Sequence, residues 1–297
     1  MTPAPRSCPP WRLGGAALLA WPLMPSAWAQ GLPPGGPTVE PAPESAPEPA
    51  PPPRRWGVAI GAVGTAGPEF AGASRIGFNL QPGLALRWGR VSLASRSAFA
   101  VRGEGGPPLG GLRVELVRSE RWRSSLGLRW DSGRDEDSAT ELEGLGDVRG
   151  TLRARLALGY RFDGGWRAGA SLTSDLLGRG GGWAGELSGG RDLRLSARTS
   201  AGASLSLGYG GRRWQQTYYG ISPEQSARTA YPVYTPGAGL RDLGFGLSAR
   251  TELGEGWALF YGASVSRLVG PSAASPLVRE RKGWGLSAGV VKRWGGS

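Results

Sequence analysis

The sequence predicts an all-β protein: a transmembrane antiparallel up-and-down β-barrel preceded by a signal peptide and a proline-rich linker. Three observations support this fold class. The composition is rich in glycine (52 of 297 residues) and tryptophan (13), apolar and polar side chains alternate from Trp56 onwards, and no stretch after the N-terminal segment is long and apolar enough for a membrane-spanning helix. A chain without such a helix crosses a bilayer only as a closed barrel, because all its backbone polar groups must be paired internally.

The first 29 residues have the pattern of a cleavable secretory signal. Arg6 and Arg12 precede an apolar run over 13–23, and Ala27 and Ala29 supply the small residues that signal peptidase recognises. The run is shorter than the roughly 20 residues that a membrane anchor needs. The single cysteine, Cys8, lies in this segment, so we expect no disulfide or thiol chemistry in the exported protein.

The proline-rich segment that follows cannot form a hydrophobic core. Residues 30–54 contain mainly Pro with scattered Ala and Glu, a composition that favours extended, unpacked chain. We therefore divide the chain into a signal peptide (1–29), a disordered linker (30–54) and an outer-membrane β-barrel (55–297).

Alternation with a period of two residues defines the strands of the predicted barrel. In the clearest case Leu243, Phe245 and Leu247 alternate with glycine and serine. Aromatic residues recur near the segment ends, as in the aromatic girdles at the two bilayer interfaces. About twelve strands of roughly ten residues follow, near 56–66, 76–88, 90–102, 111–118, 121–131, 148–162, 165–176, 182–194, 198–210, 239–252, 256–268 and 283–294.

Connections between the predicted strands alternate in length. Short links are expected at 89, 119–120, 163–164 and 254–255, and long ones at 66–75, 103–110, 132–147, 211–238 and 269–282. Outer-membrane barrels have short periplasmic turns and long external loops, so an even strand count with both ends in the periplasm explains this order. A soluble β-sandwich gives no reason for it.

The formal net charge of +12 does not indicate a nucleic-acid partner, because the arginines are dispersed rather than clustered. Most fall on the polar face of predicted strands. Two interpretations remain open: a positive lumen that favours anions, or arginines that pair with Glu186, Asp175, Asp242 and backbone groups to fill a narrow barrel. The lumen-facing candidates are Arg96, Arg123, Arg129, Arg153, Arg155, Arg161, Arg167, Arg198 and Arg250.

Several motifs resemble those of the MipA/OmpV family of outer-membrane proteins. The acidic stretch 130–148 is similar to the family's acidic loop, 218–222 with Ser226-Ala227 to its "YYGVS…SA" signature, and 275–278 to its "SP-hydrophobic-V" element. The similarity extends over roughly 55–294. Family members commonly end on an aromatic residue read by the barrel-assembly machinery, whereas here Trp294 is followed by Gly-Gly-Ser. Two expectations remain open: Trp294 takes that role, or assembly is less efficient.

The resemblance implies a scaffold in the cell envelope that links a lytic transglycosylase to a murein synthase. Other branches of the family are described as porin-like or adhesive. From the resemblance we expect a binding or scaffolding protein, with a porin-like channel for small solutes as the alternative and adhesion as a further one.

No enzyme site is expected. The chain has no histidine, the usual general base of barrel enzymes, and no carboxylate pair forms a recognisable constellation. We assign no catalytic, cofactor-binding or metal-binding residues. Carboxylates in the acidic loop could bind a divalent cation, but the loop lacks the spacing of a calcium loop. We expect a solvated external loop that pairs with Arg134 or bridges lipopolysaccharide through cations. Candidate binding-loop residues are Asp135, Glu136, Asp137, Tyr218, Tyr219, Ser275 and Pro276.

Overall fold

The computed structural model describes residues 56–68, 71–73, 75–95 and 111–296. The expected signal peptide (1–29) and linker (30–54), and Arg96, lie outside the described residues. Among the residues described, no helix combines the length and apolar character required to cross a bilayer.

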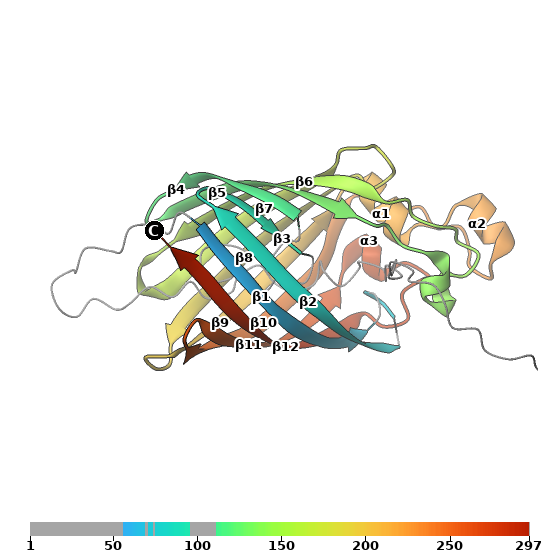
Figure 1. Cartoon of the computed structure of the whole chain (residues 1–297). Helices are drawn as coiled ribbons and strands as arrows, with labels where there is room; N and C mark the ends of the chain where they lie inside the picture. The colour runs from blue at the N-terminus through green and yellow to red at the C-terminus, as the bar shows by residue number, and fades with distance from the viewer. Residues whose placement is uncertain (1–55, 69–70, 74, 96–110, 297) are drawn as a thin grey trace, which may run out of the picture.

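The described chain forms one closed antiparallel β-barrel (Figure 1). Each strand pairs with its neighbours in sequence, and β1 pairs with β12 to close the ring. This confirms the predicted architecture. The strands are β1 Trp56–Pro68, β2 Ile76–Trp88, β3 Val91–Ala94, β4 Gly111–Arg118, β5 Trp122–Asp131, β6 Thr151–Arg161, β7 Trp166–Asp175, β8 Trp183–Arg194, β9 Thr199–Gly210, β10 Gly239–Gly254, β11 Trp257–Leu268 and β12 Lys282–Gly296.

Strand register separates an outer apolar face from an inner polar face. Residues paired across antiparallel strands share a face. Trp56 pairs with Trp88 on the outside, and Ala59 pairs with Ala85 on the inside, where both are buried. Outward apolar side chains have no protein covering them: Phe78, for example, is 83% exposed. Such a surface suits the hydrocarbon of a bilayer and is too large for a soluble monomer.

Exposed tryptophans form a girdle at each end of the barrel, as the sequence predicted. Six lie near the end where the described chain begins and ends, at Trp56 and Gly296, and three near the opposite end, and all nine have exposed side chains. Lys292 lies on the outer face with its Nζ 5.2 Å from the centre of the Trp257 ring, where its ammonium group can reach the headgroups. The nine are Trp56, Trp88, Trp122, Trp166, Trp257 and Trp294, and then Trp130, Trp183 and Trp284.

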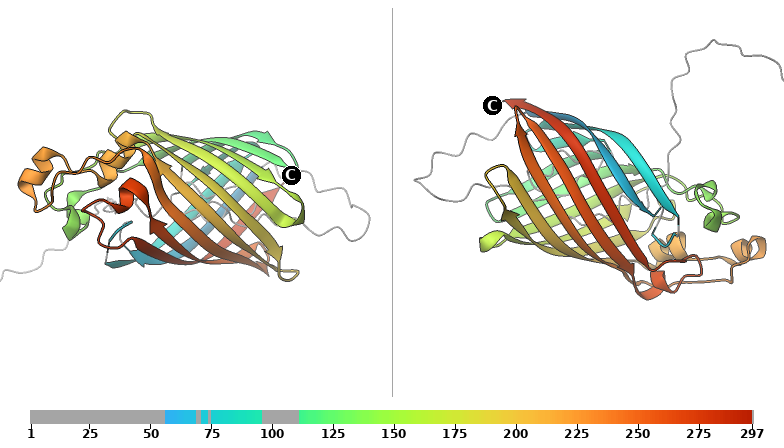
Figure 2. Two further views of the ribbon diagram at one scale, coloured as in Figure 1. Left: turned by 180° about the vertical axis from the view of Figure 1, so that it is seen from behind. Right: turned by 90° about the horizontal axis from the view of Figure 1, so that it is seen from below.

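Short turns and long loops lie at opposite ends of the barrel. The turns at 89–90, 119–121, 162–165, 195–198 and 255–256 are at the end of the termini, and the loops at 132–150, 211–238 and 269–281 are at the other (Figure 2). The turn after β6 contains a 3-10 helix, Asp163–Gly165, and requires glycine at position 165: its φ is +81°, and a Cβ there would lie 2.4 Å from the Asp192 carbonyl oxygen. The expected loop at 103–110 lies outside the described residues.

Candidate functional site: the cap and the charged barrel interior

Two of the long loops carry three short α-helices at the loop end of the barrel. These are α1 (Arg212–Tyr219), α2 (Pro223–Arg228) and α3 (Gly270–Ala273) (Figure 1). Ser222 starts α2 with a capping box: its hydroxyl accepts from the Gln225 amide, and the Gln225 side chain accepts from the Ser222 amide. We refer to these helices, the loops that carry them and the β5–β6 loop (132–150) as the cap.

Aromatic side chains of α1 form the inner layer of the cap. Trp214 and Tyr219 are buried, and the Trp214 ring centre lies 4.9 Å from that of Tyr218 and 5.9 Å from that of Tyr219. The Arg241 guanidinium of β10 lies 5.0 Å from the centre of the Trp214 ring. The spacing of 214 and 218 puts both on one helix face, so α1 turns its aromatic face toward the barrel wall.

Hydrogen bonds between loops hold α1 in place. The Ser272 hydroxyl of α3 donates to the Gln215 side chain over 2.7 Å, and both side chains are fully buried. The Ser275 hydroxyl donates to the Tyr219 carbonyl over 2.6 Å. Because α1 belongs to the β9–β10 loop and Ser272 and Ser275 to the β11–β12 loop, the cap is a tertiary structure assembled from distant segments.

Barrel residues reach up to the cap through a buried ion pair. Arg153 of β6 donates from Nε to Asp131 of β5 over 2.5 Å, and from Nη2 to the Tyr218 hydroxyl over 2.6 Å. The Arg153 and Asp131 side chains are 2% and 1% exposed. Arg134 donates from Nη1 to the Tyr218 carbonyl over 3.1 Å. Tyr218 therefore links the cap to the barrel wall.

Burial shifts the titration of cap groups. Burial raises the pKa of the Tyr219 hydroxyl well above its ordinary value. Burial also raises the pKa of the Tyr218 hydroxyl, although the nearby charge of Arg153 lowers it in part. Burial also lowers the pKa of the Arg134 guanidinium. Both phenols are therefore neutral hydrogen-bonding groups at neutral pH.

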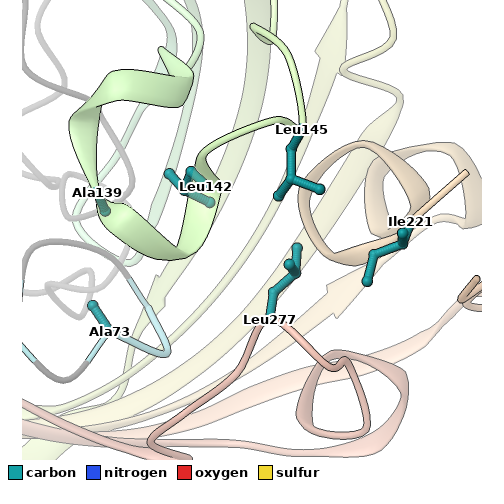
Figure 3. Close-up of a cluster of buried hydrophobic side chains, with 6 residues drawn as sticks. All are labelled: Ala73, Ala139, Leu142, Leu145, Ile221 and Leu277. Atoms are coloured by element: carbon teal, nitrogen blue, oxygen red, sulfur yellow. The ribbon is translucent and has the colours of Figure 1, made fainter. Parts of the chain in front are cut away.

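A second apolar cluster forms the outer layer of the cap. Figure 3 shows side chains from four loops converging, with Leu142 and Leu145 facing Ile221 and Leu277, and Ala73 and Ala139 beside them. Ile221 is completely buried. Since none of these segments can bury its apolar residues alone, the cluster holds the loops together.

The acidic loop, with 3-10 helices Glu136–Ser138 and Thr140–Leu142, is internally hydrogen-bonded. The Glu136 amide donates to Asp147, and the Glu136 carboxylate accepts from the Gly146 amide. Asp135 and Asp137 are exposed. Within the described ranges, no group of three acidic, histidine or cysteine side chains is placed to hold a metal ion.

The candidate binding-loop residues divide into two groups. Asp135 and Asp137 lie on the surface, whereas Tyr219 and Ser275 are buried and Tyr218, Glu136 and Pro276 are partly buried. Tyr218, Tyr219 and Ser275 hold the cap to itself and to the wall. The longest loop thus folds into the mouth of the barrel instead of presenting its tyrosines outward.

Most of the predicted lumen arginines lie on the inner face. Register and alternation place Arg123, Arg129, Arg153, Arg155, Arg161, Arg167 and Arg250 there. Arg198 is an exception: it lies exposed in the β8–β9 turn, so its expected place in the lumen was wrong. The strand was predicted to start one residue too early, and a turn residue does not follow the inward and outward alternation of the strand after it.

Interior arginines pair with carboxylates along the wall. Arg155 lies 3.7 Å from Glu186 as predicted, and Arg167 lies 3.1 Å from Asp192. The other two carboxylates expected to pair with the lumen-facing arginines, Asp242 and Asp175, have different partners among the described residues. Asp242 pairs with its neighbour Arg241. Asp175 accepts from the Thr151 hydroxyl and from the Leu177 and Gly181 amides, which caps the loop after β7.

Sequence reasoning missed the residues that join cap to wall. Asp131 and Arg134 were assigned only to the acidic loop, and Trp214 and Arg241 had no assigned role. Asp131 could have been recognised, because it continues the inward alternation of β5 beyond Arg129. Trp214 gave no such signal, since it lies in a loop without strand periodicity.

An apolar outer belt between two aromatic girdles, around a polar inner face, defines the class of protein as an outer-membrane β-barrel. The family model described as "MltA-interacting protein MipA" matches residues 60–294, and the chain belongs to this family. This confirms the resemblance seen in the sequence motifs.

Comparison with solved structures gives distant likenesses. The chain is similar to the NanC porin (7% identity, TM-score 0.41, 78% of this chain and 98% of that one). It is also similar to the COG4313 outer membrane channel from Pseudomonas putida F1 (12% identity, TM-score 0.39, 84% of this chain and 100% of that one). No curated protein matches the sequence.

Proposed function

We propose that this protein is an outer-membrane binding or scaffolding protein whose partner is a murein enzyme, a lytic transglycosylase, together with a murein synthase. The family description, MltA-interacting protein, supports the choice of partner. The observation that carries the proposal is the cap, whose side chains pack at one end of the barrel.

The cap is packed like a protein core. Trp214 and Tyr219 are buried against α3 and the barrel, and Leu142 and Ile221 are at most 1% exposed. A solute crossing at this end would have to displace side chains that each bury a large apolar area. Such a closed mouth favours binding over passage.

The end with the short turns is the expected docking face. In outer-membrane barrels the short turns face the periplasm, where murein lies, and Trp56 pairs with Gly296 at this same end. The five turns there and the adjoining girdle form a compact surface. A partner in the periplasm meets this surface, and the cap faces outward.

Affinity capture from envelope extracts tests the proposal. Tagged full-length protein in mild detergent is compared with a variant in which the exposed turn arginines Arg121, Arg194 and Arg198 are changed to Glu, and with the cap variant Asp135→Asn. Recovery of a lytic transglycosylase by the wild type and the cap variant, with loss in the turn variant, is the expected result. Failure to recover any murein hydrolase or synthase, with the barrel intact by heat-modifiable gel migration, excludes the scaffold function.

Passive passage of small solutes is the second candidate, favoured by the arginine-rich inner face. Planar-bilayer recording of the reconstituted protein tests it, with a variant lacking 212–219 as an open-mouth control. If the scaffold function is right, the wild type gives no discrete openings and the shortened variant does. Regular openings from the wild type identify a channel instead.

A further inference from the structure

We propose that the inner wall formed by β2 to β6 contains an anion-binding site, centred on Arg155 and Arg113, for a small polyvalent oxyanion bearing carboxylate or phosphate groups. The site is independent of the scaffold function: it lies within the barrel and not on the surface that would meet a protein partner.

Cross-strand register places three arginines in one row. Arg87 pairs with Ser92, Ser92 with Arg113, Arg113 with Gly127, and Gly127 with Arg155. Arginine thus occupies alternate strands, β2, β4 and β6, and a small residue occupies each strand between them. Alternate strands are about 10 Å apart, so two guanidinium groups can reach one ligand above the intervening glycine.

Positive charge exceeds negative charge around this row. Glu115 is shared, with its Oε2 3.6 Å from Arg87 and 3.5 Å from Arg118. Arg155 has Glu186 at 3.7 Å. Among the described residues, this neighbourhood therefore holds four guanidinium groups, those of Arg87, Arg113, Arg118 and Arg155, and two carboxylates, those of Glu115 and Glu186, a balance that attracts an anion in a partly desolvated site.

A buried donor at the β6 end of the row points to a ligand. The Nε of Arg155 is inaccessible and has no hydrogen-bond partner among the described residues. Its Nη2 contacts Glu186 at 3.7 Å, which is an ion-pair distance and longer than a hydrogen bond. A buried cationic N–H normally has a partner, and an oxyanion can supply one, because a guanidinium presents paired N–H groups to two oxygens.

The facing wall is lined by small residues. On the inner faces of β9 and β10, Ser206 pairs with Gly244, Ser204 with Gly246, and Gly202 with Ser248. These side chains take up little volume, and serine hydroxyls donate or accept hydrogen bonds. A charged wall opposite a small polar wall suits a compact, hydrated anion better than an apolar or extended ligand.

Calorimetric titration of the full-length protein in non-ionic detergent, with citrate and inorganic phosphate as probes, tests the site. We expect saturable binding that weakens about tenfold to hundredfold in Arg155→Gln and Arg113→Gln, the loss for a charge-assisted hydrogen bond. Arg191→Gln is the matched control. Arg191 is exposed on the outer face, where it stacks on Trp166, and this variant should bind like the wild type.

A steric variant separates a local site from general charge. Gly127→Leu keeps every arginine but puts a side chain between Arg113 and Arg155, and a Cβ there meets only ordinary contacts, the nearest at 3.6 Å. We expect it to abolish binding while heat-modifiable migration stays normal.

A further variant tests whether glutamates of the chain's own linker compete with citrate for the site. In this variant Glu40, Glu44 and Glu48 are changed to Gln, and tighter citrate binding than in the wild type identifies the linker as a competitor. Equal affinity in the wild type, Arg155→Gln and Gly127→Leu overturns the proposal, as does absence of binding in both the wild type and the linker variant.

Discussion

The buried pair of Arg153 and Asp131 joins the barrel wall to the cap, and we expect Asp131→Asn to be among the most damaging single substitutions. Asparagine keeps the size and shape of the side chain but removes the charge. Arg153 is 2% exposed, so its guanidinium cannot regain water when its counter-charge is lost. Arg129, whose Nη2 lies 3.9 Å from the Asp131 carboxylate, loses a counter-charge as well.

The magnitude follows from burial of both partners. Removing one member of a buried ion pair costs about 3–5 kcal/mol, because the other charge is left without compensation. Arg153 also donates a 2.6 Å hydrogen bond to the Tyr218 hydroxyl. When Arg153 shifts after the loss of Asp131, this hydrogen bond weakens as well, which further destabilises the cap. Replacing both partners, Asp131→Leu with Arg153→Met, removes both desolvation penalties but also the contacts of this pair with Arg129, the Gly133 amide and the Tyr218 hydroxyl. We therefore expect the double variant to regain part of the stability that the single variant loses.

Urea unfolding of the detergent-solubilised barrel, followed by tryptophan fluorescence, measures these differences. Limited proteolysis of the loops in parallel reports on the cap. Asp131→Asn should unfold at lower urea and expose the loops, and the double variant should recover both properties in part. The coupling energy between the two positions then comes from the double-mutant cycle. A single variant within about 1 kcal/mol of the wild type, or a double variant no better than the single one, would refute the reasoning.

Three further predictions concern the cap and the two faces of the barrel. Leu142→Ala should destabilise the cap by about 2–5 kcal/mol, because this side chain is 1% exposed in the outer cluster. We expect proteases to cleave the loops of this variant faster than those of the wild type while the heat-modifiable migration of the barrel is unchanged; equal cleavage rates in the two proteins would contradict the prediction. Burial raises the folded-state pKa of Tyr219, so the contribution of its neutral form to stability is complete below the ordinary tyrosine pKa of about 10 and is lost as pH rises above it. Loop protection should therefore fall at alkaline pH, and less so in Tyr219→Phe. Leu187→Arg, on the lipid face, should cost about 2–4 kcal/mol, whereas Ser188→Arg, on the inner face of the same strand, should fold; similar refolding yields into vesicles would contradict this assignment of faces.

Local sequence pattern determined the barrel. Alternation across β10, the tryptophans at strand ends and the segregation of short from long connections predicted the strands, their outward faces and the common end of the termini. These features are predictable because a lipid-facing strand has a fixed side-chain period, and each strand obeys it independently of its neighbours. The same alternation put Arg153 and Arg155 on the inner face.

Tertiary structure alone decided the cap and the partners inside the barrel. Trp214, Ser275 and Leu142 come from three loops, and a loop has no periodicity that marks a residue as buried. Which carboxylate meets which arginine depends on where the side chains meet in the closed barrel: Asp175 is the direct cross-strand partner of Arg153, yet Arg153 donates to Asp131 of the other neighbouring strand. Sequence therefore determined the direction in which each strand residue points, and only the closed fold determined what it meets there, because those contacts join positions far apart in the chain.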